Sequence, residues 1–291
     1  MTGLKRFFKK YGASYFLLSF WLVLFLFFTV IPIVASVLLS FTDFDMVNAL
    51  KPVGVDNYIR LLLDDDIFIK ALGNTLFYAL LTGPAGYLLS FIVAWLINET
   101  GRNMRAALTL IFYAPALAGN VFMAWQYIFS GDAYGILNSL LMRFGFIAEA
   151  IQWQNDPQYN SIVVITVILW MSMGAGFLSF VAGFKQLNTS LYEAAAMDGL
   201  HNRWQELWYI TLPQMVPQLL IGAVLTISTS FAVGYQNSVL TGNPSTDYST
   251  HTVVLHMSDY GYTRLEMGYA CTVAVVLFVI MIATWTLINR G

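Results

Sequence analysis

The chain has 291 residues, of which 58% are hydrophobic and 10% are charged, and its net charge at pH 7 is −2. Soluble domains average about 25% charged residues, so this composition excludes an ordinary soluble protein and indicates a polytopic membrane protein. The near-neutral charge gives no case for a nucleic-acid partner. A single domain over residues 1–291 is predicted, because no composition break or internal repeat divides the sequence.

Six apolar segments without Asp, Glu, Lys or Arg predict an all-α protein with six transmembrane helices. The first covers about residues 15–39 and follows four basic residues. It is longer than the roughly 7–15-residue core of a cleaved signal peptide, so we expect a membrane helix there. The other predicted spans cover about residues 71–97, 106–129, 161–184, 215–235 and 267–288.

The distribution of Lys and Arg predicts the orientation, because basic residues near span ends concentrate on the cytoplasmic side. A cytoplasmic amino terminus places nine of the fourteen basic residues inside, namely Lys5, Arg6, Lys9, Lys10, Arg102, Arg105, Lys185, Arg203 and Arg290. Both termini are therefore predicted to be cytoplasmic. The acidic cluster Asp64, Asp65 and Asp66 then faces outside, where we expect a solvated surface; docking of a partner is the alternative.

Several kinds of site are missing from the sequence. The predicted spans carry no ionisable side chain of the kind that ion-coupled carriers use, and no Walker A loop is present. His201, His251 and His256 fall in predicted loops without metal-ligand spacing, so no metal site is expected. A membrane-embedded enzyme would need a catalytic constellation, which is also missing. Any uphill transport must take its energy from another chain; an ATP-independent carrier or channel for a neutral solute is the alternative.

The polar interval at residues 190–217 predicts two short helices between the fourth and fifth spans. Ser190 and Glu193 have the spacing of a capping box at the start of the first helix, and Gly199 is expected to end it. Asn202 supplies a cap for the second helix. Pro213 and Pro217 are expected to stop or kink the chain that follows. A rigid element tied to two spans can convert the motion of a partner into a change of cavity access.

This interval resembles the EAA motif of the membrane subunits of bacterial binding-protein-dependent ABC importers. The matching residues are Glu193-Ala194-Ala195, Asp198-Gly199, Ile210, Leu212-Pro213 and Pro217. The resemblance implies a type I importer permease fold in the bacterial plasma (inner) membrane, with a coupling-helix segment at about residues 188–217. The residues implied to dock an ATP-hydrolysing subunit are Glu193, Ala194, Ala195, Asp198 and Gly199.

The resemblance extends to sugar-type permeases through PALAGNVFMAWQYIF, followed by Tyr134-Gly135 and Asn138, and through SVLTGNP at residues 238–244. The second stretch is similar to the first permease of maltose- and glycerol-phosphate-type systems. The implied partners are a homologous second permease, two ATP-binding subunits that carry ATP and Mg, an extracytoplasmic solute-binding protein and a carbohydrate. No cofactor is expected in this chain, and it is not expected to be an enzyme.

A sugar pathway needs neutral hydrogen-bonding groups on one helix face. Ser230, Gly234 and Asn237 are spaced i, i+4, i+7, so they are predicted to share a face of the fifth span. By resemblance this face lines the substrate cavity, together with Asn120 in the third span and Met171, Ser172 and Ala175 in the fourth. The alternative is that Ser, Gly and Asn here serve helix packing. Because the spans carry no cation, a neutral oligosaccharide is the preferred cargo.

Overall fold

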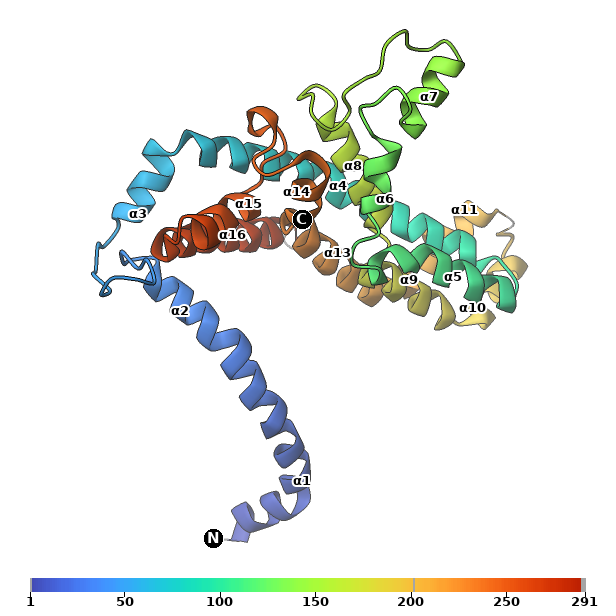
Figure 1. Cartoon of the computed structure of the whole chain (residues 1–291). Coiled ribbons are helices and arrows are strands. Elements are labelled where there is room, and N and C mark those ends of the chain that lie inside the picture. Colours follow the sequence, from blue (N-terminus) through green and yellow to red (C-terminus); the bar gives the residue numbers. More distant parts are fainter. Residues whose placement is uncertain (1, 201, 289–291) are drawn as a thin grey trace. The chain divides into compact units, whose positions relative to one another are not determined.

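The computed structural model describes residues 2–200 and 202–288, and helices make up most of both ranges (Figure 1). Within these ranges, β-type pairing is limited to one antiparallel bridge between Thr42 and Pro52. His201 and Arg290 lie outside the described residues.

The α-helices are α1 (Thr2–Phe25), α2 (Ile31–Leu39), α3 (Asp56–Ile59), α4 (Asp66–Asn98), α5 (Arg102–Leu117), α6 (Met123–Ile128), α7 (Ile136–Arg143), α8 (Asn160–Met171), α9 (Ala175–Lys185), α10 (Thr189–Met197), α11 (Arg203–Glu206), α12 (Leu212–Gln214), α13 (Val216–Phe231), α14 (Tyr235–Thr241), α15 (Val253–Ser258) and α16 (Met267–Ile288). Short π-helical turns are η1 (Leu26–Val30), η2 (Arg60–Asp64), η3 (Leu207–Thr211) and η5 (Asp259–Thr263), and η4 (Thr246–Tyr248) is a 3-10 turn.

The chain contacts define two compact units. The first contains Met1–Asp65 and His256–Val279, and the second contains Asp66–Leu255 and Ile280–Gly291. Helices α15 and α16 therefore contribute residues to both units. The single domain over residues 1–291 stays a prediction, because two compact units can belong to one domain.

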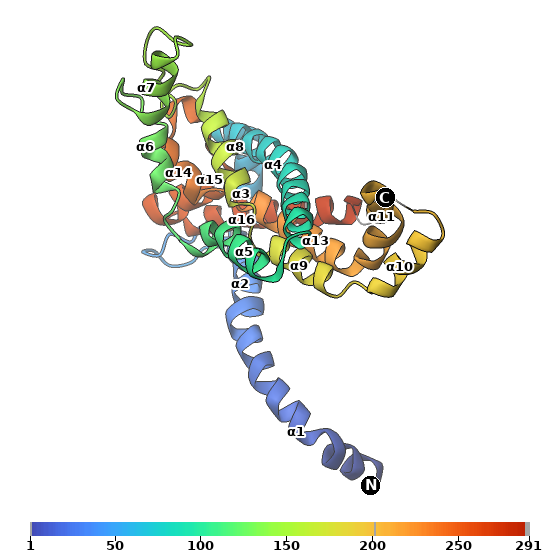
Figure 2. The ribbon, with the colours of Figure 1, turned by 90° about the vertical axis from the view of Figure 1, so that its right-hand side faces the viewer.

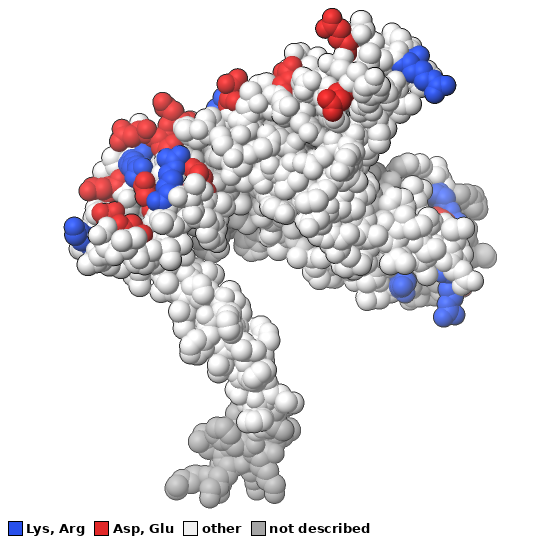
Figure 3. Space-filling view, in the orientation of Figure 1, with Lys and Arg blue, Asp and Glu red and all other residues white. Residues whose placement is uncertain are grey.

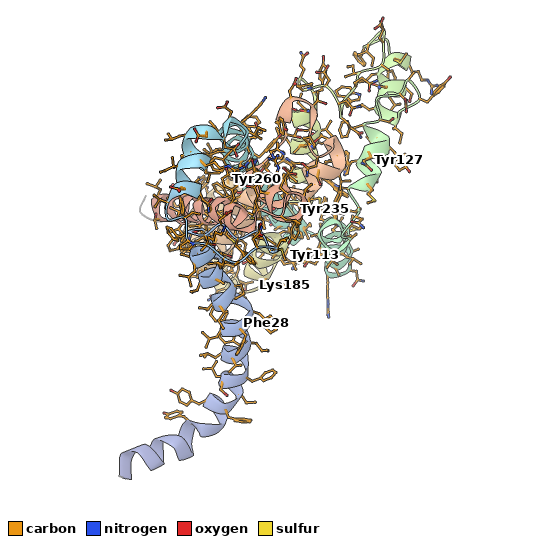
Figure 4. The ribbon with its side chains drawn as sticks, turned by 60° about the vertical axis from the view of Figure 1, so that its left-hand side comes forward. Phe28, Tyr113, Tyr127, Lys185, Tyr235 and Tyr260 are labelled. Atoms are coloured by element: carbon orange, nitrogen blue, oxygen red, sulfur yellow. The ribbon has the colours of Figure 1, made fainter. Side chains whose placement is uncertain are left out.

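The first unit contains the apolar helix formed by α1, η1 and α2. Its segment Tyr15–Leu39 has a mean hydropathy of 2.9, and none of it is buried. Phe28 is 78% exposed and points away from the ribbon in Figure 4. An uncovered apolar surface of this length suits the hydrocarbon of a bilayer, which agrees with the first predicted span.

Three side chains of the first unit meet around the carboxylate of Asp65, which is only 9% exposed, and a fourth, Arg60, packs on one of them. Its Oδ2 accepts a hydrogen bond from the Tyr269 hydroxyl at 2.7 Å and from the Tyr260 hydroxyl at 3.4 Å, and it lies 3.0 Å from His256 Nε2. The Arg60 guanidinium lies 4.3 Å from the centroid of the Tyr269 ring. These donors compensate the burial of the carboxylate.

The prediction of a solvated acidic surface is therefore wrong for Asp65, although Asp64 and Asp66 are exposed. The reason is a break between elements. Turn η2 ends at Asp64 and α4 begins at Asp66, so the intervening residue adopts a non-helical conformation, with φ −105° and ψ 84°. The sequence-based placement of His256 in a loop is also wrong, since this residue belongs to α15.

The core of the second unit is the mutual packing of α4, α9 and α13 (Figure 2). Small residues allow the close approach. A Cβ built on Gly222 of α13 would lie 2.5 Å from the Phe180 ring of α9, and one on Gly86 of α4 would lie 2.9 Å from the Ser172 side chain. Phe180 also makes edge-to-face contacts with Phe91 and Tyr87. Small-residue interfaces of this kind are common in membrane helix bundles.

The opposite end of α4, near Asp66, is anchored by the loop that follows α14. Asn74 Nδ2 donates to the carbonyl oxygens of Tyr248 and His251, both at 2.9 Å, and the Val253 amide donates to the Thr75 hydroxyl. Asn237 of α14 is fully buried and donates to the Thr250 carbonyl. The loop is therefore ordered by polar side chains of the helices that flank it.

The described helices include four that are long and apolar enough to cross a membrane, or up to five when one bent pair is counted as a span. The four are Tyr15–Leu39, Asp66–Asn98, Asn160–Lys185 and Met267–Leu287, and they match the first, second, fourth and sixth predicted spans. The fifth predicted span, residues 215–235, overlaps α13, which is bent by 81° from the helix Arg203–Gln214 before it. Six spans and cytoplasmic termini stay predictions.

The third predicted span, residues 106–129, is not one continuous helix. Helix α5 ends at Leu117, an irregular stretch follows, and the short α6 resumes at Met123. Gly119 and Asn120 lie in this irregular stretch. Residues at helical spacing on either side of this stretch therefore do not share one helix face.

We predict that Gly222→Ala destabilises the protein by about 1–3 kcal/mol, because the added methyl overlaps the buried Phe180 ring. The measurement is the thermal unfolding midpoint in mild detergent. Gly73→Ala is the matched control, since a Cβ at Gly73 in α4 meets nothing within 4 Å. Alanine favours a helix over glycine by about 1 kcal/mol, so the control should be neutral or stabilised. Equal midpoints for the two variants would contradict the packing argument.

We predict that the first unit loses stability as the pH falls below about 6.5, the ordinary pKa of histidine. Burial lowers the pKa of His256, and the nearby carboxylate of Asp65 opposes that shift. The unfolded chain therefore binds the proton more readily than the folded chain, so acid favours unfolding. The measurement is the rate of limited proteolysis around residues 256–265 between pH 7.5 and pH 5.5. The variant His256→Gln should flatten this pH dependence, and an unchanged slope would refute the prediction.

Candidate functional site

A cavity of about 300 Å³ lies within the second unit, where α4, α5, α8, α9 and α13 meet. The residues that line it are Thr82, Ala116, Ile168, Met171, Ser172, Gly174, Ala175, Gly176, Leu225, Thr226, Thr229, Ser230, Val233 and Gln236. The cavity therefore takes side chains from helices that are far apart in the sequence.

Two helix breaks border the cavity. The chain leaves α8 after Met171 and re-enters a helix at Ala175, so Ser172 and Gly174 lie at a break. It leaves α13 after Phe231 and resumes at Tyr235. Irregular backbone at membrane depth is tolerated where it lines a polar cavity, because it can then be solvated or bind a solute.

The polar groups of the cavity are neutral hydroxyls and one amide. The hydroxyls of Ser172, Thr229 and Ser230 donate to backbone carbonyls of their own helices, which leaves their oxygen lone pairs as acceptors. No described hydrogen bond involves the Thr226 hydroxyl or the Gln236 amide as donor or acceptor. No Asp, Glu, Lys, Arg or His lines the cavity. This set of groups suits a ligand with several hydroxyls and no charge.

Four of the seven predicted substrate residues line this cavity, namely Met171, Ser172, Ala175 and Ser230. Asn120 is exposed in the irregular stretch after α5. Gly234 packs against Val254, where a Cβ would come within 2.8 Å of its side chain. Asn237 does not line the cavity; its Nδ2 donates to the Thr250 carbonyl, and its Oδ1 is buried without a described partner. A substrate role for any of the seven stays a prediction.

The predicted common face of Ser230, Gly234 and Asn237 is wrong, because the helix between them is interrupted. Gly234 has φ −165° and ψ −62°, which is not helical, and α14 begins only at the next residue. The interruption changes the register, so Gln236 lines the cavity and its neighbour Asn237 does not. Thr226 and Thr229 were also missed. They share the face of Ser230 by i, i+3, i+4 spacing, which could have identified them.

The surface segment after α9 consists of two short helices, as predicted. Gly199 ends α10 with φ +91°, and the bonds from Gly199 N to Ala196 O and from Leu200 N to Ala195 O form a Schellman motif. Asn202 caps α11 by accepting from the Trp204 amide. These two predictions are confirmed.

The predicted capping box of Ser190 and Glu193 is wrong. The N-cap of α10 is Asn188, whose Oδ1 accepts from the Ser190 amide at 3.1 Å and from the Ser190 hydroxyl at 2.8 Å. Ser190 lies inside the helix, so its hydroxyl cannot reach the capping position. No described hydrogen bond or ion pair involves the Glu193 carboxylate, which is exposed.

The predicted coupling residues lie together on α10 and the turn after it. Glu193, Ala194, Asp198 and Gly199 are exposed, and Ala195 is half-buried. Met197 on the same helix is 89% exposed. The segment therefore presents two carboxylates beside small and apolar side chains, and it holds its shape through caps at the helix ends.

The comparisons with known proteins assign the family. The model of the binding-protein-dependent transport system inner membrane component matches residues 1–289, and the chain belongs to this family. It is 33% identical over 275 residues to the probable ABC transporter permease protein YesP of Bacillus subtilis (strain 168), covering 92% of this chain and 86% of that protein. It is 27% identical over 278 residues to the arabinooligosaccharides transport system permease protein AraP of the same organism, covering 95% and 87%.

A solved structure supports the fold. A chain of a bacterial ABC transporter involved in the import of the acidic polysaccharide alginate superposes with a TM-score of 0.78 and 24% identity, covering 99% of this chain and 98% of that chain. At this identity the likeness establishes the fold, which is that of an ABC importer permease. The predicted family and the helical permease fold are confirmed, and the chain is a multi-pass membrane protein.

Proposed function

We propose that this chain is the permease subunit of an ATP-driven importer for a neutral sugar or oligosaccharide, and that its cavity forms half of the pathway. The observation that carries the proposal is the neutral, hydroxyl-rich lining of the cavity at two helix breaks. The family and the name of the relative AraP support a carbohydrate substrate.

The charge of the cavity favours a neutral cargo. A sulfonate, uronate or phosphate that left water would need a cationic partner, because burying an unpaired charge is costly. The cavity lining holds no cation. Sugar hydroxyls can instead donate to the acceptor oxygens of Ser172, Thr229 and Ser230, and can exchange hydrogen bonds with the Gln236 amide. The expected second permease would supply the other half of the pathway.

The surface segment at residues 188–217 would transmit the energy of ATP hydrolysis from the partner subunits to this chain. Helix α10 exposes small side chains that can enter a groove of an ATP-binding subunit, and such subunits would carry ATP and Mg. The connection to the cavity is covalent: α9 leads from the break at Gly174 to α10, and α13 leads from the bend at Met215 back to Ser230. A displacement of this segment would therefore act on both broken helices. An extracytoplasmic solute-binding protein would deliver the sugar.

The alternative is an ATP-independent carrier or channel for a neutral solute. The test is native mass spectrometry of the affinity-tagged chain, extracted from its own membranes in mild detergent. We expect one homologous permease and two ATP-binding subunits to be recovered with it. A monomer or homo-oligomer that still transports solute after reconstitution without ATP would refute the importer and establish the carrier.

We predict that Gln236→Leu raises the KM for uptake about threefold to tenfold, because it removes neutral hydrogen bonds worth roughly 0.5–1.5 kcal/mol. Uptake is measured in proteoliposomes with the sugar found by screening the co-purified binding protein. Basal ATP hydrolysis should persist, because Gln236 lies outside the surface segment at residues 188–217 and lines the cavity instead. Gln158→Leu, at an exposed loop position, is the control and should leave the KM unchanged. An unaltered KM in Gln236→Leu would remove this residue from the pathway.

We predict that Gly199→Asp lowers transport and substrate-stimulated ATP hydrolysis about tenfold or more, equivalent to about 1.4 kcal/mol of lost docking energy. The left-handed conformation of Gly199 strains any side chain, and the added carboxylate would lie on the docking surface. A Cβ there meets nothing within 4 Å, so the core should stay intact. Gly145→Asp imposes the same strain in another open loop, with φ +74°, and should transport normally. Equal activity of the two variants would contradict the coupling role.

A further inference from the structure

A second cavity, of about 380 Å³, lies in the second unit beside the surface segment. It is enclosed by the end of α4, the start of α5, the end of α9, and helices α10 and α11. Figure 3 shows Lys and Arg side chains gathered around this end of the second unit. The proposed transport pathway does not use this cavity, since its lining residues differ from those of the first cavity.

The charged groups in its lining are three cations and two carboxylates. Both carboxylates form ion pairs with Arg203, whose guanidinium lies 2.8 Å from Glu206 and 3.3 Å from Glu99. No described ion pair involves Arg105 or Lys185. The lining therefore has a net charge of +1, in which Arg203 and its two carboxylates together carry −1 and the unpaired Arg105 and Lys185 carry +2.

The Arg105 guanidinium is anchored by hydrogen bonds through one nitrogen and keeps other N–H groups without a described partner. Its Nη2 donates to the carbonyl oxygens of Asn98 and Thr100, which fixes the guanidinium against the loop between α4 and α5. No described hydrogen bond uses its Nη1, which is therefore the donor left for a ligand, whereas its Nε also lacks a described partner but is closed off from solvent. Lys185, labelled in Figure 4, ends α9 and makes no described polar contact. A guanidinium and an ammonium with free donors are the groups that bind phosphate oxygens.

The position of the cavity indicates where the phosphate comes from. Asn98 is the last residue of the candidate span Asp66–Asn98, and Lys185 is the last residue of the candidate span Asn160–Lys185. Lipid headgroups lie at the level where spans end, and exposed aromatic rings gather there. Trp204 and Trp208 are 61% and 65% exposed beside this cavity, and Trp204 packs against Trp95 in its lining.

We propose that this cavity binds the phosphodiester headgroup of a membrane phospholipid between Arg105 and Lys185. A phosphodiester carries one negative charge, which matches the excess positive charge of the lining, whereas a phosphate monoester would leave it negative. The bound headgroup bridges the loop after α4 and the end of α9. It lies next to α10, which contributes Thr189 and Tyr192 to the lining of the cavity. It thereby braces the surface segment from the membrane side. This site does not depend on the proposed sugar transport.

The test uses the full chain, purified and delipidated in mild detergent. Native mass spectrometry and thermal unfolding are recorded with added dioleoylphosphatidylglycerol, with dioleoylglycerol, which lacks the phosphate, and with glycerol 3-phosphate, which lacks the acyl chains. We expect retention of the phosphatidylglycerol together with a raised unfolding midpoint. The other two compounds should produce neither effect at equal concentration.

Lys185→Gln should weaken phosphatidylglycerol binding at least about fivefold, the effect of one basic residue near an anionic lipid. The variant should fold, because Lys185 makes no described polar contact. Lys185→Arg should retain binding.

Arg102→Gln is the matched control, since it removes an exposed cation one turn from Arg105 without touching the cavity. Equal loss in Lys185→Gln and Arg102→Gln, or equal binding of dioleoylglycerol, would overturn the site. Full competition by glycerol 3-phosphate would assign it to a soluble phosphate monoester instead.

Discussion

The close approach of α4, α9 and α13 is the constraint on which the second unit depends. Gly222 lets α13 approach the Phe180 ring of α9, and Gly86 lets α4 approach the break at Ser172. Because the backbones come so near, little room remains for large side chains at the centre, and small hydroxyl residues border the cavity. The same contacts that hold the helices together thus place neutral hydroxyl groups among the apolar side chains that line the cavity.

The helices of this core also connect the cavity to the surface segment. Helix α9 has the break at Gly174 near one end and Lys185, next to α10, at the other. Helix α13 begins at the bend near Met215, which is buried against the apolar core cluster, and ends beside the cavity. Rigid helices anchored in this way transmit a displacement with little loss, because packed cores shift between discrete arrangements rather than deform. The phosphodiester cavity lies beside the same connection.

Sequence periodicity identified Ser230 on α13, missed Thr226 and Thr229, and failed where the helix stopped. Spacing assigns a common face only while φ and ψ stay helical, and Gly234 interrupts them, so Gln236 replaces Asn237 at the cavity. The N-cap of α10 was likewise predicted at Ser190 and lies at Asn188. Both residue types can cap a helix, and only the backbone conformation decides where the helix begins. Asp65 reads as one of three equivalent acids, yet three donors distant in sequence bury it.

The sequence by itself determined the membrane class, the four clearest spans, the two surface helices and the family, because hydropathy, glycine and asparagine caps and the EAA residues act over short stretches of chain. Only the tertiary structure decided which hydroxyls meet at the cavity, which acid is buried, and which cations lack a carboxylate. Each of these depends on which residues far apart in the chain come to line the same cavity, such as Thr82 and Ser230 in the first or Arg105 and Lys185 in the second. Local patterns carry no information on how such segments meet.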